Sequence, residues 1–368
     1  MASTAAKHFE TVIIGGGQAG LAVGYHLATQ QRSFVILDAG ERIGDSWRNR
    51  WDSLRVFTPA RYDGLPGSSF PAPGWSYPTK DEVADYLESY AARFRLPVRA
   101  GVHVDDLSRE NGGYVVTSGL SQYYADNVVV ATGGYHAPRI PEFAAELDPT
   151  IVQLHSTQYR NPSQLRDGAV LVVGAGNSGA EIAIEAASGH QTWLSGRDTG
   201  QEPVRAGAGL DRLLTPPFWF LLSHVLTTRT PPGRKVERQL SSHGLPLARV
   251  RRKDLSRAGI ERVPRITGVR DGLPLHADGQ TLDVTTVIWC TGFVPDYSWI
   301  QLPVFEPDGR PRHDRGLVRS EPGLAFIGLF FQSAGTSSLI GGVGRDARRI
   351  ARHLTSRRTT ATPTRARD

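Results

Sequence analysis

The sequence predicts an α/β protein built from two copies of one strand–turn–helix–strand unit, with the second copy inserted into the first. An apolar run that ends in the pattern Gly-x-Gly-x-x-Gly occurs twice, at Gly15–Gly20 and at Gly174–Gly179. After each pattern come a helix-like stretch and another apolar run, which is the order strand, helix, strand. Two further apolar runs, 127–131 and 284–290, are each followed by Thr-Gly, so both halves also close in the same way.

The individual elements follow from apolar spacing and from helix-start signals. Thr79 and Glu82 have the spacing of a capping box, which predicts that a helix begins there. The run 127–131 is almost continuously apolar, which is typical of a strand buried on both faces. The predicted strands are 9–14, 34–37, 98–104, 114–118, 122–124, 127–131, 169–173, 192–194, 284–289 and 324–327, and the predicted helices are 18–30, one from Thr79, 178–188 and one from about 342.

The glycine pattern has a physical meaning that points to a dinucleotide. The first glycine allows a tight turn out of the strand, the second lets backbone approach a pyrophosphate, and the third allows close packing of helix on strand. The amino end of the helix then faces the phosphates with its partial positive charge. One such pattern is weak evidence in a chain with 40 glycines. Two copies in the same context predict two Rossmann-like dinucleotide-binding domains.

The residue aimed at the ribose differs between the two copies. Asp38 follows the second strand of the first unit, and Arg197, beside Ser195, occupies the corresponding place in the second unit. A carboxylate at this place accepts hydrogen bonds from ribose hydroxyls, whereas an arginine accommodates a 2′-phosphate. We therefore predict two different dinucleotides, with NADPH on the second unit, an arrangement typical of a two-dinucleotide flavoprotein.

Length and composition favour a soluble protein of two domains. A chain of 368 residues is long for one core, and 39% hydrophobic with 21% charged residues is ordinary for a globular protein. We expect the first part of the FAD domain at 1–160, the NADP domain at 161–292 and a return to the FAD domain at 293–355. The last stretch, 356–368, is rich in threonine and arginine with almost nothing apolar, and we expect it to be a disordered tail.

Cysteine and charge exclude two classes of protein. Cys290 is the only cysteine, which excludes a disulfide framework and the internal dithiol pair that disulfide reductases of the same plan need. The formal net charge is +6, and the arginines crowd 345–367 without interleaved aromatic residues. This pattern indicates a solvated helix face and tail, so no nucleic-acid partner is expected. The eleven histidines show no ligand spacing, so no metal is expected either.

No membrane or secretory segment is expected. The first strand begins within ten residues of Met1, which leaves no room for a charged and then apolar leader, and we expect a cytoplasmic location. The apolar stretch 217–226 is far shorter than the ~20 residues of a spanning helix. Core packing or the lining of a substrate cavity is its first interpretation, and a membrane-facing patch is the alternative.

A set of short segments accompanies the two glycine patterns. These segments are 44–47 (Gly-Asp-Ser-Trp), 77–80 (Tyr-Pro-Thr-Lys), 131–133 (Ala-Thr-Gly), 155–159 (His-Ser-Thr-Gln-Tyr) and 290–296 (Cys-Thr-Gly-Phe-Val-Pro-Asp). Through these segments nearly the whole chain resembles the class B flavin-containing monooxygenases, most closely the YUCCA-like branch and its bacterial relatives. The family signature is present only in its second half, because His155 and Tyr159 fit it whereas Pro149 and Ile151 replace its phenylalanine and glycine.

The resemblance implies the site residues. FAD would be bound by Gly15, Gly17, Gln18, Ala19, Gly20, Asp38, Ser46, Trp47, Val104 and Thr132, and NADP by Gly174, Gly176, Asn177, Ser178, Gly179, Ser195 and Arg197. His155 and Thr58 are the candidate catalytic residues, although in the related enzymes the histidine couples nicotinamide binding to the flavin and is no acid or base on the substrate. Gln332 and Ser333 are further polar groups expected near the flavin edge.

The implied reaction is that of an oxidoreductase. NADPH would reduce FAD, the reduced flavin would trap O2 as a C4a-(hydro)peroxide, and a small organic substrate would receive one oxygen atom. Candidate substrates are amines, thioethers and 2-oxo acids that undergo oxidative decarboxylation. Three alternatives remain open: an NADPH oxidase or flavin reductase, a Baeyer–Villiger monooxygenase, and a flavin-binding sensor without activity. The substrate and the oligomeric state are not predicted.

Overall fold

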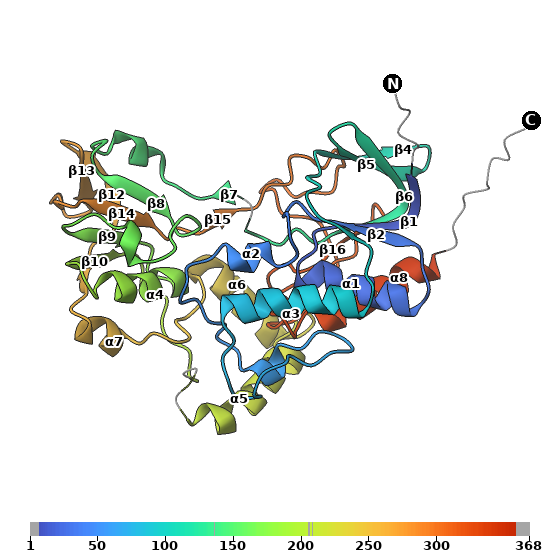
Figure 1. Ribbon diagram of the computed structural model, residues 1–368, viewed down its shortest axis with the longest axis horizontal. Coiled ribbons are helices and arrows are strands. Elements are labelled where there is room, and N and C mark those ends of the chain that lie inside the picture. The colour runs from blue at the N-terminus through green and yellow to red at the C-terminus, as the bar shows by residue number, and fades with distance from the viewer. Residues whose placement is uncertain (1–6, 136, 205–206, 208, 358–368) are drawn as a thin grey trace, which may run out of the picture.

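The computed structural model describes residues 7–135, 137–204, 207 and 209–357, which form two α/β units side by side (Figure 1). The first unit is built on a seven-stranded sheet in the order β3-β2-β1-β6-β5-β4, and β16 pairs with the second half of β6. These strands are β1 (Lys7–Ile14), β2 (Phe34–Leu37), β3 (Val98–Arg99), β4 (Asp106–Glu110), β5 (Gly113–Ser118), β6 (Ser121–Val130) and β16 (Leu324–Phe326).

The central strands of the first sheet are buried on both faces, because alternate side chains enter two different cores. Ile13 and Ile36 enter a core that is completed by the helices α1 (Gln18–Thr29), α3 (Lys80–Arg93) and α8 (Gly344–Ser356). Val12 and Val35 enter a second core on the opposite face, covered by the β4–β5 hairpin and the segment 297–305. The predicted capping box of Thr79 and Glu82 opens α3.

The second unit carries a five-stranded sheet in the order β11-β10-β9-β14-β8, in which every pair is parallel. Helices α4 (Asn177–Ala186) and α7 (Arg252–Arg257) cover one face, and the β12–β13 hairpin with the turn η2 (Glu142–Glu146) covers the other. The strands are β8 (Val152–His155), β9 (Val170–Val173), β10 (Thr192–Ser195), β11 (Glu261–Val263) and β14 (Thr286–Trp289), with the hairpin formed by β12 (Ile266–Arg270) and β13 (Leu273–His276).

The chain crosses between the units twice, and the two crossings lie side by side. β7 (Ala137–Pro138) on the way out pairs antiparallel with β15 (Phe293–Val294) on the way back. The second unit is therefore inserted into the first, as the repeated pattern predicts. The insertion starts earlier than the expected boundary at 160, because β8 is already an edge strand of the second sheet.

Several helical segments lie away from the two sheets. α5 (Asp211–Phe220) continues into one π-helical turn, η4 (Leu221–Val225), and α6 (Pro231–His243) follows. In Figure 1 they lie below and behind the junction of the two units. The short helix α2 (Asp45–Arg48) lies at the junction itself, and two short 3-10 turns are η1 (Ala60–Tyr62) and η3 (Pro162–Gln164).

The structure corrects the expected bounds of one strand and of the carboxyl-terminal tail. The runs 122–124 and 127–131 form one strand, β6, because its first half pairs with β5 and its second half pairs with β16. Helix α8 continues through Ser356, the first residue of the expected tail, and the rest of that tail from 358 lies outside the described residues.

Candidate functional site

Both glycine patterns form the predicted turn, and the two turns are built alike. Gly15 and Gly174 have φ angles of +111° and +110°, a conformation that glycine adopts without strain. A Cβ on Gly20 would lie 1.9 Å from the Gly15 carbonyl oxygen, and a Cβ on Gly179 would lie 1.7 Å from the Gly174 oxygen. The third glycine of each pattern is therefore what allows α1 and α4 to pack onto their turns.

The second glycine of each pattern faces open space. A Cβ built on Gly17 or on Gly176 would have no heavy atom within 4 Å. These glycines are the N-caps of α1 and α4, and no side chain caps either helix. The first backbone N–H groups of both helices therefore point at the open space, which is how helix amino ends bind phosphate. Both turns fit the pyrophosphate of a dinucleotide.

Asp38 lies against the first turn at the end of β2. Its Oδ2 accepts a hydrogen bond from the Gly16 N–H at 2.5 Å, and its Oδ1 accepts one from the Gly40 N–H at 2.9 Å. Each carboxylate oxygen keeps a second acceptor site. Asp38 is thus fixed by backbone and can still accept the ribose hydroxyls of FAD.

Thr132 provides an independent indication that the first site holds a ligand. Its Oγ1 is buried and has no hydrogen-bond partner among the described residues, an arrangement that costs free energy unless a ligand or water satisfies it. Thr132 follows β6 beside the first turn, where the preceding carbonyl of Ala131 lies 2.5 Å from the Cβ position of Gly15. An FAD at this turn would lie within reach of the orphaned hydroxyl.

The other expected FAD residues lie around the same sheet edge, with different roles available to them. Ser46 is exposed and Trp47 is half-buried on α2, against the helical core of the first unit. Val104 is buried in the opposite core with Ile14 and Leu37, so only its backbone can contact a cofactor.

Ser195, which is expected to bind NADP, uses its hydroxyl within the protein. It is fully buried, its hydroxyl donates to the Pro264 carbonyl at 2.9 Å, and it accepts from the Ile266 N–H at 3.2 Å. These bonds tie β10 to the start of β12, so an NADP contact of Ser195 would be made by its backbone and stays a prediction. Arg197, two residues on, is exposed and donates to the Ser242 carbonyl at 3.1 Å, and its role remains a prediction.

The side-chain amide of Asn177 also forms hydrogen bonds within the protein. Its Nδ2 donates to the Pro246 carbonyl at 3.0 Å and its Oδ1 accepts from the Ala248 N–H at 2.9 Å. The side chain therefore fastens the loop around Leu247 to α4. The amide keeps one N–H and one acceptor site, so a contact of Asn177 with NADP stays a prediction.

His155 has partners within the protein on both ring nitrogens. It is buried, its Nε2 lies 3.1 Å from the Gly292 carbonyl, and its Nδ1 lies 3.0 Å from the Thr157 hydroxyl. A carbonyl can only accept, so Nε2 carries the proton, and Nδ1 accepts from the Thr157 N–H at 3.3 Å, which fits a neutral ring. Burial and the charge of Arg50 lower the pKa of His155, while the bond to Gly292 raises it. These contacts join the end of β8 to the returning crossing and give His155 a positioning role, and a catalytic role stays a prediction.

Thr58 points away from open space as well. Its hydroxyl donates to Oδ1 of Asp63 at 2.5 Å, and both side chains are buried. Burial raises the pKa of Asp63 to about 7, with the Thr58 bond acting in the opposite direction, and Oδ2 has no partner among the described residues. Asp63 is a functional candidate that sequence reasoning missed, although it lies only five residues after Thr58.

The late polar residues also have partners within the chain. Gln332 accepts from the Leu329 N–H at 3.3 Å and donates to the Arg315 carbonyl at 3.4 Å. The Ser333 hydroxyl donates to Asp346 at 2.5 Å, at the start of α8. These contacts hold the loop before α8 in place, and a direct role at the flavin stays a prediction.

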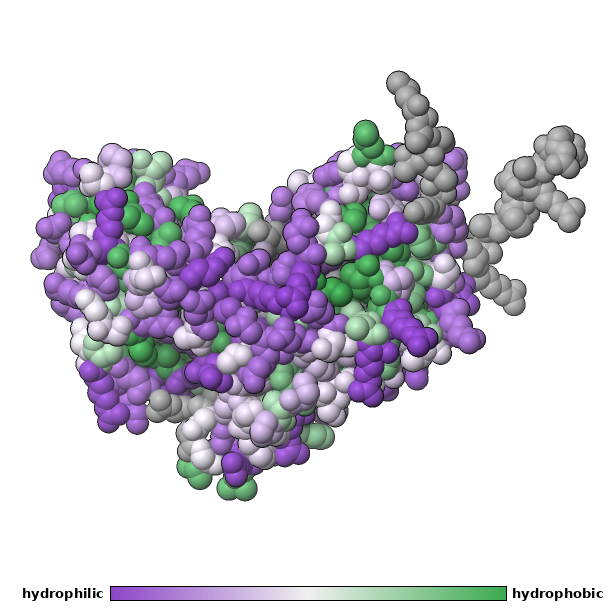
Figure 2. Space-filling model, in the orientation of Figure 1, coloured by the Kyte–Doolittle hydropathy of each residue, from purple (hydrophilic) through white to green (hydrophobic). Residues whose placement is uncertain are grey.

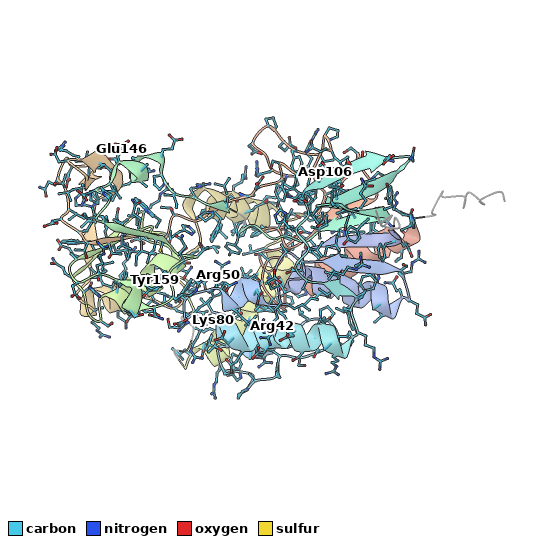
Figure 3. The ribbon with its side chains drawn as sticks, turned by 45° about the horizontal axis from the view of Figure 1, so that its top comes forward. Arg42, Arg50, Lys80, Asp106, Glu146 and Tyr159 are labelled. Atoms are coloured by element: carbon cyan, nitrogen blue, oxygen red, sulfur yellow. The ribbon has the colours of Figure 1, made fainter. Side chains whose placement is uncertain are left out.

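Arg50 is the charged residue that sequence reasoning missed at the junction. Its guanidinium carbon lies 5.1 Å from the Tyr135 ring centroid and 5.6 Å from that of Phe293, within cation–π range. Its Nε donates to the Ser46 carbonyl at 3.1 Å. Burial lowers its pKa. Figure 3 shows Arg50 between the two units, and the only sequence signal for it is its position three residues after Trp47.

A second set of contacts joins the units through the signature residue Tyr159. Tyr159 is fully buried, and its hydroxyl donates to Glu185 Oε2 at 2.9 Å, while the other oxygen of Glu185 accepts from Ser53 of the first unit. Trp51 of the first unit is buried in the core of the second, beside α4. The loop 51–53 therefore anchors one glycine turn at a fixed place relative to the other.

Comparisons with known proteins agree with this architecture. Residues 12–206 match the family described as "Pyridine nucleotide-disulphide oxidoreductase". A Geobacillus kaustophilus protein named "Uncharacterized oxidoreductase CzcO-like" is 42% identical over 342 residues, covering 92% of this chain and 96% of that protein. The chain belongs to this family of flavin-dependent oxidoreductases. FAD and NADPH are the cofactors that the family implies, and both turns fit them.

Two further relatives identify the monooxygenase-like part of the family. The flavin-containing monooxygenase of Stenotrophomonas maltophilia superposes with a TM-score of 0.73 at 29% identity, covering 95% of this chain and 99% of that one. "Probable indole-3-pyruvate monooxygenase YUCCA1" of Arabidopsis thaliana is 29% identical over 335 residues, covering 82% of this chain and 80% of that protein. The resemblance to class B flavin-containing monooxygenases is thereby confirmed, and the chain is an enzyme of that type.

The described part of the chain offers neither a metal centre nor a membrane-spanning helix. No group of three or more His, Cys, Asp or Glu side chains in this part of the chain is placed to hold a metal ion. Among the helices of the described ranges, none combines the length and hydropathy needed to cross a bilayer.

Proposed function

We propose that this enzyme is an FAD-dependent, NADPH-consuming monooxygenase that transfers one atom of O2 to a small organic acid, with 2-oxo acids as the first substrate class. The observation that carries the proposal is the position of Arg50. It extends from the Trp47 segment of the first site toward Phe293, next to Gly292 of the second site. A cation held between the two cofactor sites suits a substrate with a carboxylate.

Arg50 is built to bind a carboxylate in one orientation. A guanidinium offers a planar fork of donors, and a carboxylate pairs with it through two parallel hydrogen bonds. The rings of Tyr135 and Phe293 hold the guanidinium by cation–π contacts, and partial burial strengthens its attraction for an anion. His155 supports this arrangement, because its bond to Gly292 fixes the segment that carries Phe293.

The reaction balances with the expected co-substrates. A 2-oxo acid, O2, NADPH and a proton give the acid shortened by one carbon, CO2, water and NADP+. When bound, FAD supplies the hydride acceptor and the activation of O2. The protein binds the substrate carboxylate at Arg50, holds both dinucleotides at their turns and keeps the two units in register through Tyr159 and Trp51. The name of the Arabidopsis relative, an indole-3-pyruvate monooxygenase, supports the choice of a 2-oxo acid.

An NADPH oxidase is the second candidate, favoured by the missing first half of the signature at Pro149 and Ile151. Both candidates consume NADPH and O2, so the decisive measurement is the fate of the oxygen. We would supply 18O2 and NADPH with a panel of 2-oxo acids, amines and thioethers, and quantify labelled product and hydrogen peroxide. Label in the shortened acid supports the proposal. One hydrogen peroxide per NADPH with every substrate would show that the enzyme is an NADPH oxidase. 18O found only in an N-oxide or S-oxide would show that the substrate is an amine or a thioether and not an acid.

A further inference from the structure

The helix formed by α5 and η4 turns polar side chains toward the protein and apolar side chains toward the solvent. Its buried side chains are polar, namely Asp211, Thr215 and Ser223. Most of its exposed side chains are apolar: Leu213 is 72% exposed and Phe220 59%, whereas the exposed polar side chains are those of Arg212 and His224. The full set of exposed apolar residues here is Leu210, Leu213, Leu214, Phe220, Leu221 and Val225. A surface helix normally buries its apolar stripe, so this orientation indicates a partner for the outer face.

Specific polar contacts fix the helix in this orientation. The Tyr77 hydroxyl donates to the Asp211 carboxylate, which also accepts from the Gly207 N–H at 3.0 Å. At the other end, the Ser223 and Thr336 hydroxyls lie 3.3 Å apart. Turning the apolar stripe inward would break these buried hydrogen bonds, which is costly. The stripe therefore stays on the surface.

The exposed stripe is continuous and lies at an extremity of the molecule. Positions 210, 213, 214, 217, 220 and 221 recur at intervals of three and four along α5, so they share one helix face, and Val225 follows in the π-helical turn. Figure 1 shows α5 at the lower end of the molecule, and Figure 2 shows hydrophobic atoms at the same lower tip. A protruding apolar helix can enter a deformable surface, and the rest of the protein then needs no shape complementarity to that surface.

The charges around the stripe identify the kind of surface. Between residues 209 and 238 the sequence has five basic residues, Arg212, Arg229, Arg234, Lys235 and Arg238, and two acidic residues, Asp211 and Glu237. Asp211 is buried and hydrogen-bonded, so it does not face outward. Basic residues beside an apolar helix face are typical of helices that lie in the interface of an anionic bilayer. A second copy of the chain fits poorly, because a two-fold contact would bring like charges together.

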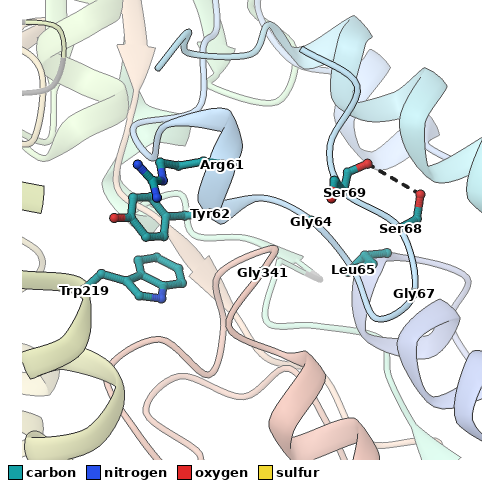
Figure 4. Close-up of a pocket in the computed structure, with 9 residues that line it drawn as sticks. All are labelled: Arg61, Tyr62, Gly64, Leu65, Gly67, Ser68, Ser69, Trp219 and Gly341. Carbon is teal, nitrogen blue, oxygen red and sulfur yellow. Dashed lines mark hydrogen bonds between the residues drawn. The ribbon is translucent and has the colours of Figure 1, made fainter. Parts of the chain in front are cut away.

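We propose that α5 and η4 dock onto the surface of an anionic lipid bilayer, with the apolar stripe at the headgroup–acyl boundary and the basic residues on the lipid phosphates. Trp219 on the same helix stacks on Tyr62, with ring centroids 4.8 Å apart, and both line a cavity of about 510 Å3 (Figure 4). The Trp219 side of α5 therefore packs on the first unit, which leaves the opposite side of the helix for the lipid.

The test uses the full-length holoenzyme and vesicles of phosphatidylcholine with or without phosphatidylglycerol. We expect the protein to sediment with the anionic vesicles, and the variant Leu213→Gln/Phe220→Gln to bind at least about tenfold less, because two large apolar side chains no longer enter the bilayer. Leu120→Gln is the matched control, because Leu120 is 99% exposed in the β5–β6 turn, far along the chain from the stripe. Arg229→Gln/Arg234→Gln should remove the preference for the anionic lipid.

Three results would overturn the proposal. The wild-type protein could fail to sediment with anionic vesicles, or the double apolar variant could bind as well as the Leu120 control. Analytical ultracentrifugation could also reveal a wild-type dimer that the apolar variant dissociates, which would make a second copy the occupant. Retained flavin absorbance in each variant shows that the fold is intact, and none of these readouts depends on the proposed reaction.

Discussion

The two glycine turns have the same backbone conformation. They differ in whether the turn or the strand end packed against it carries a side chain. In the first turn the middle residue is Gly16, and a Cβ there would lie 3.0 Å from the Cβ of Asp38. In the second turn the same position is Ala175, and the glycine has moved to Gly196, whose Cβ would lie 2.7 Å from the Ala175 nitrogen. Gly196 also has a φ of +139°.

The difference shows that the residue type in the turn and the residue type at the end of the next strand depend on each other. A carboxylate can approach the first turn only because Gly16 has no side chain, and it then accepts that residue's N–H. At the second turn the backbone of Gly196 passes close to Ala175, and the first charged side chain, Arg197, is exposed beyond it. One geometry presents an acceptor for ribose hydroxyls close to the turn, and the other leaves room for a phosphate.

The largest expected effect comes from the third glycines, which are equivalent in both turns. Gly20→Ala and Gly179→Ala should each destabilise the protein by at least about 3 kcal/mol, because the new Cβ would overlap a carbonyl oxygen. Thermal unfolding and soluble yield measure this. Gly189→Ala is the control, since a Cβ there meets nothing within 4 Å. Normal melting of both variants would show that the helices do not depend on these contacts.

The second glycines should separate the two cofactors. Gly17→Ala should fold normally but lose FAD, because its Cβ occupies only the space reserved for the pyrophosphate. Gly176→Ala should retain FAD and lose NADPH binding. Flavin absorbance of the purified proteins and titration with NADP+ measure the two effects. A Gly17→Ala protein that purifies with full flavin content would contradict the assignment of the first turn.

Arg197→Ala should affect NADPH selectively. We expect the KM for NADPH to rise about 10- to 100-fold with little change for NADH, as for the loss of a charge-assisted contact to phosphate. Steady-state rates with both coenzymes measure the ratio. Ser195→Ala is the matched control: it should lower the melting temperature, because the Pro264 and Ile266 contacts are lost, without changing the NADPH to NADH ratio. Equal effects of Arg197→Ala on both coenzymes would exclude a 2′-phosphate contact.

The smallest effect concerns two carboxyls, Asp63 in the first unit and Glu181 in the second. Burial raises the pKa of both to about 7, but Glu181 has Arg249 at 4.0 Å, whereas among the described residues Asp63 has the Thr58 hydroxyl on one oxygen and no partner on the other. An unfolded Asp63 ionises near pH 4, so between pH 4 and pH 7 the folded state holds the extra proton and stability falls as pH rises.

Asp63→Asn removes this pH-dependent loss. The variant should gain about 1 kcal/mol or more over the wild type at pH 8 and much less at pH 4, and Glu181→Gln should gain less because it gives up the attraction of Arg249. Urea unfolding at the two pH values measures the differences. A gain for Asp63→Asn that is the same at pH 4 and pH 8 would show that Asp63 ionises normally in the folded protein.

The sequence by itself determined the two turns, the acid at Asp38, the capping box of α3 and the insertion of one unit into the other. These features depend on local properties, such as the missing Cβ of glycine and the reach of a threonine to its own helix, and such properties are the same in any fold. Family membership could also be predicted, because it is carried by short motifs around these turns.

Only the tertiary structure decided which partner each polar side chain meets. Ser195 and Thr58 have the right residue type for a cofactor site, yet long-range packing turns their hydroxyls toward Pro264 and Asp63. Arg50 and Phe293 are far apart in the sequence and meet only because the two crossings lie side by side. The apolar stripe of α5 looked like core, and buried contacts of Asp211 and Ser223 turned it outward. A hydrogen-bonding or apolar side chain has many possible partners, and its choice depends on contacts across the whole fold.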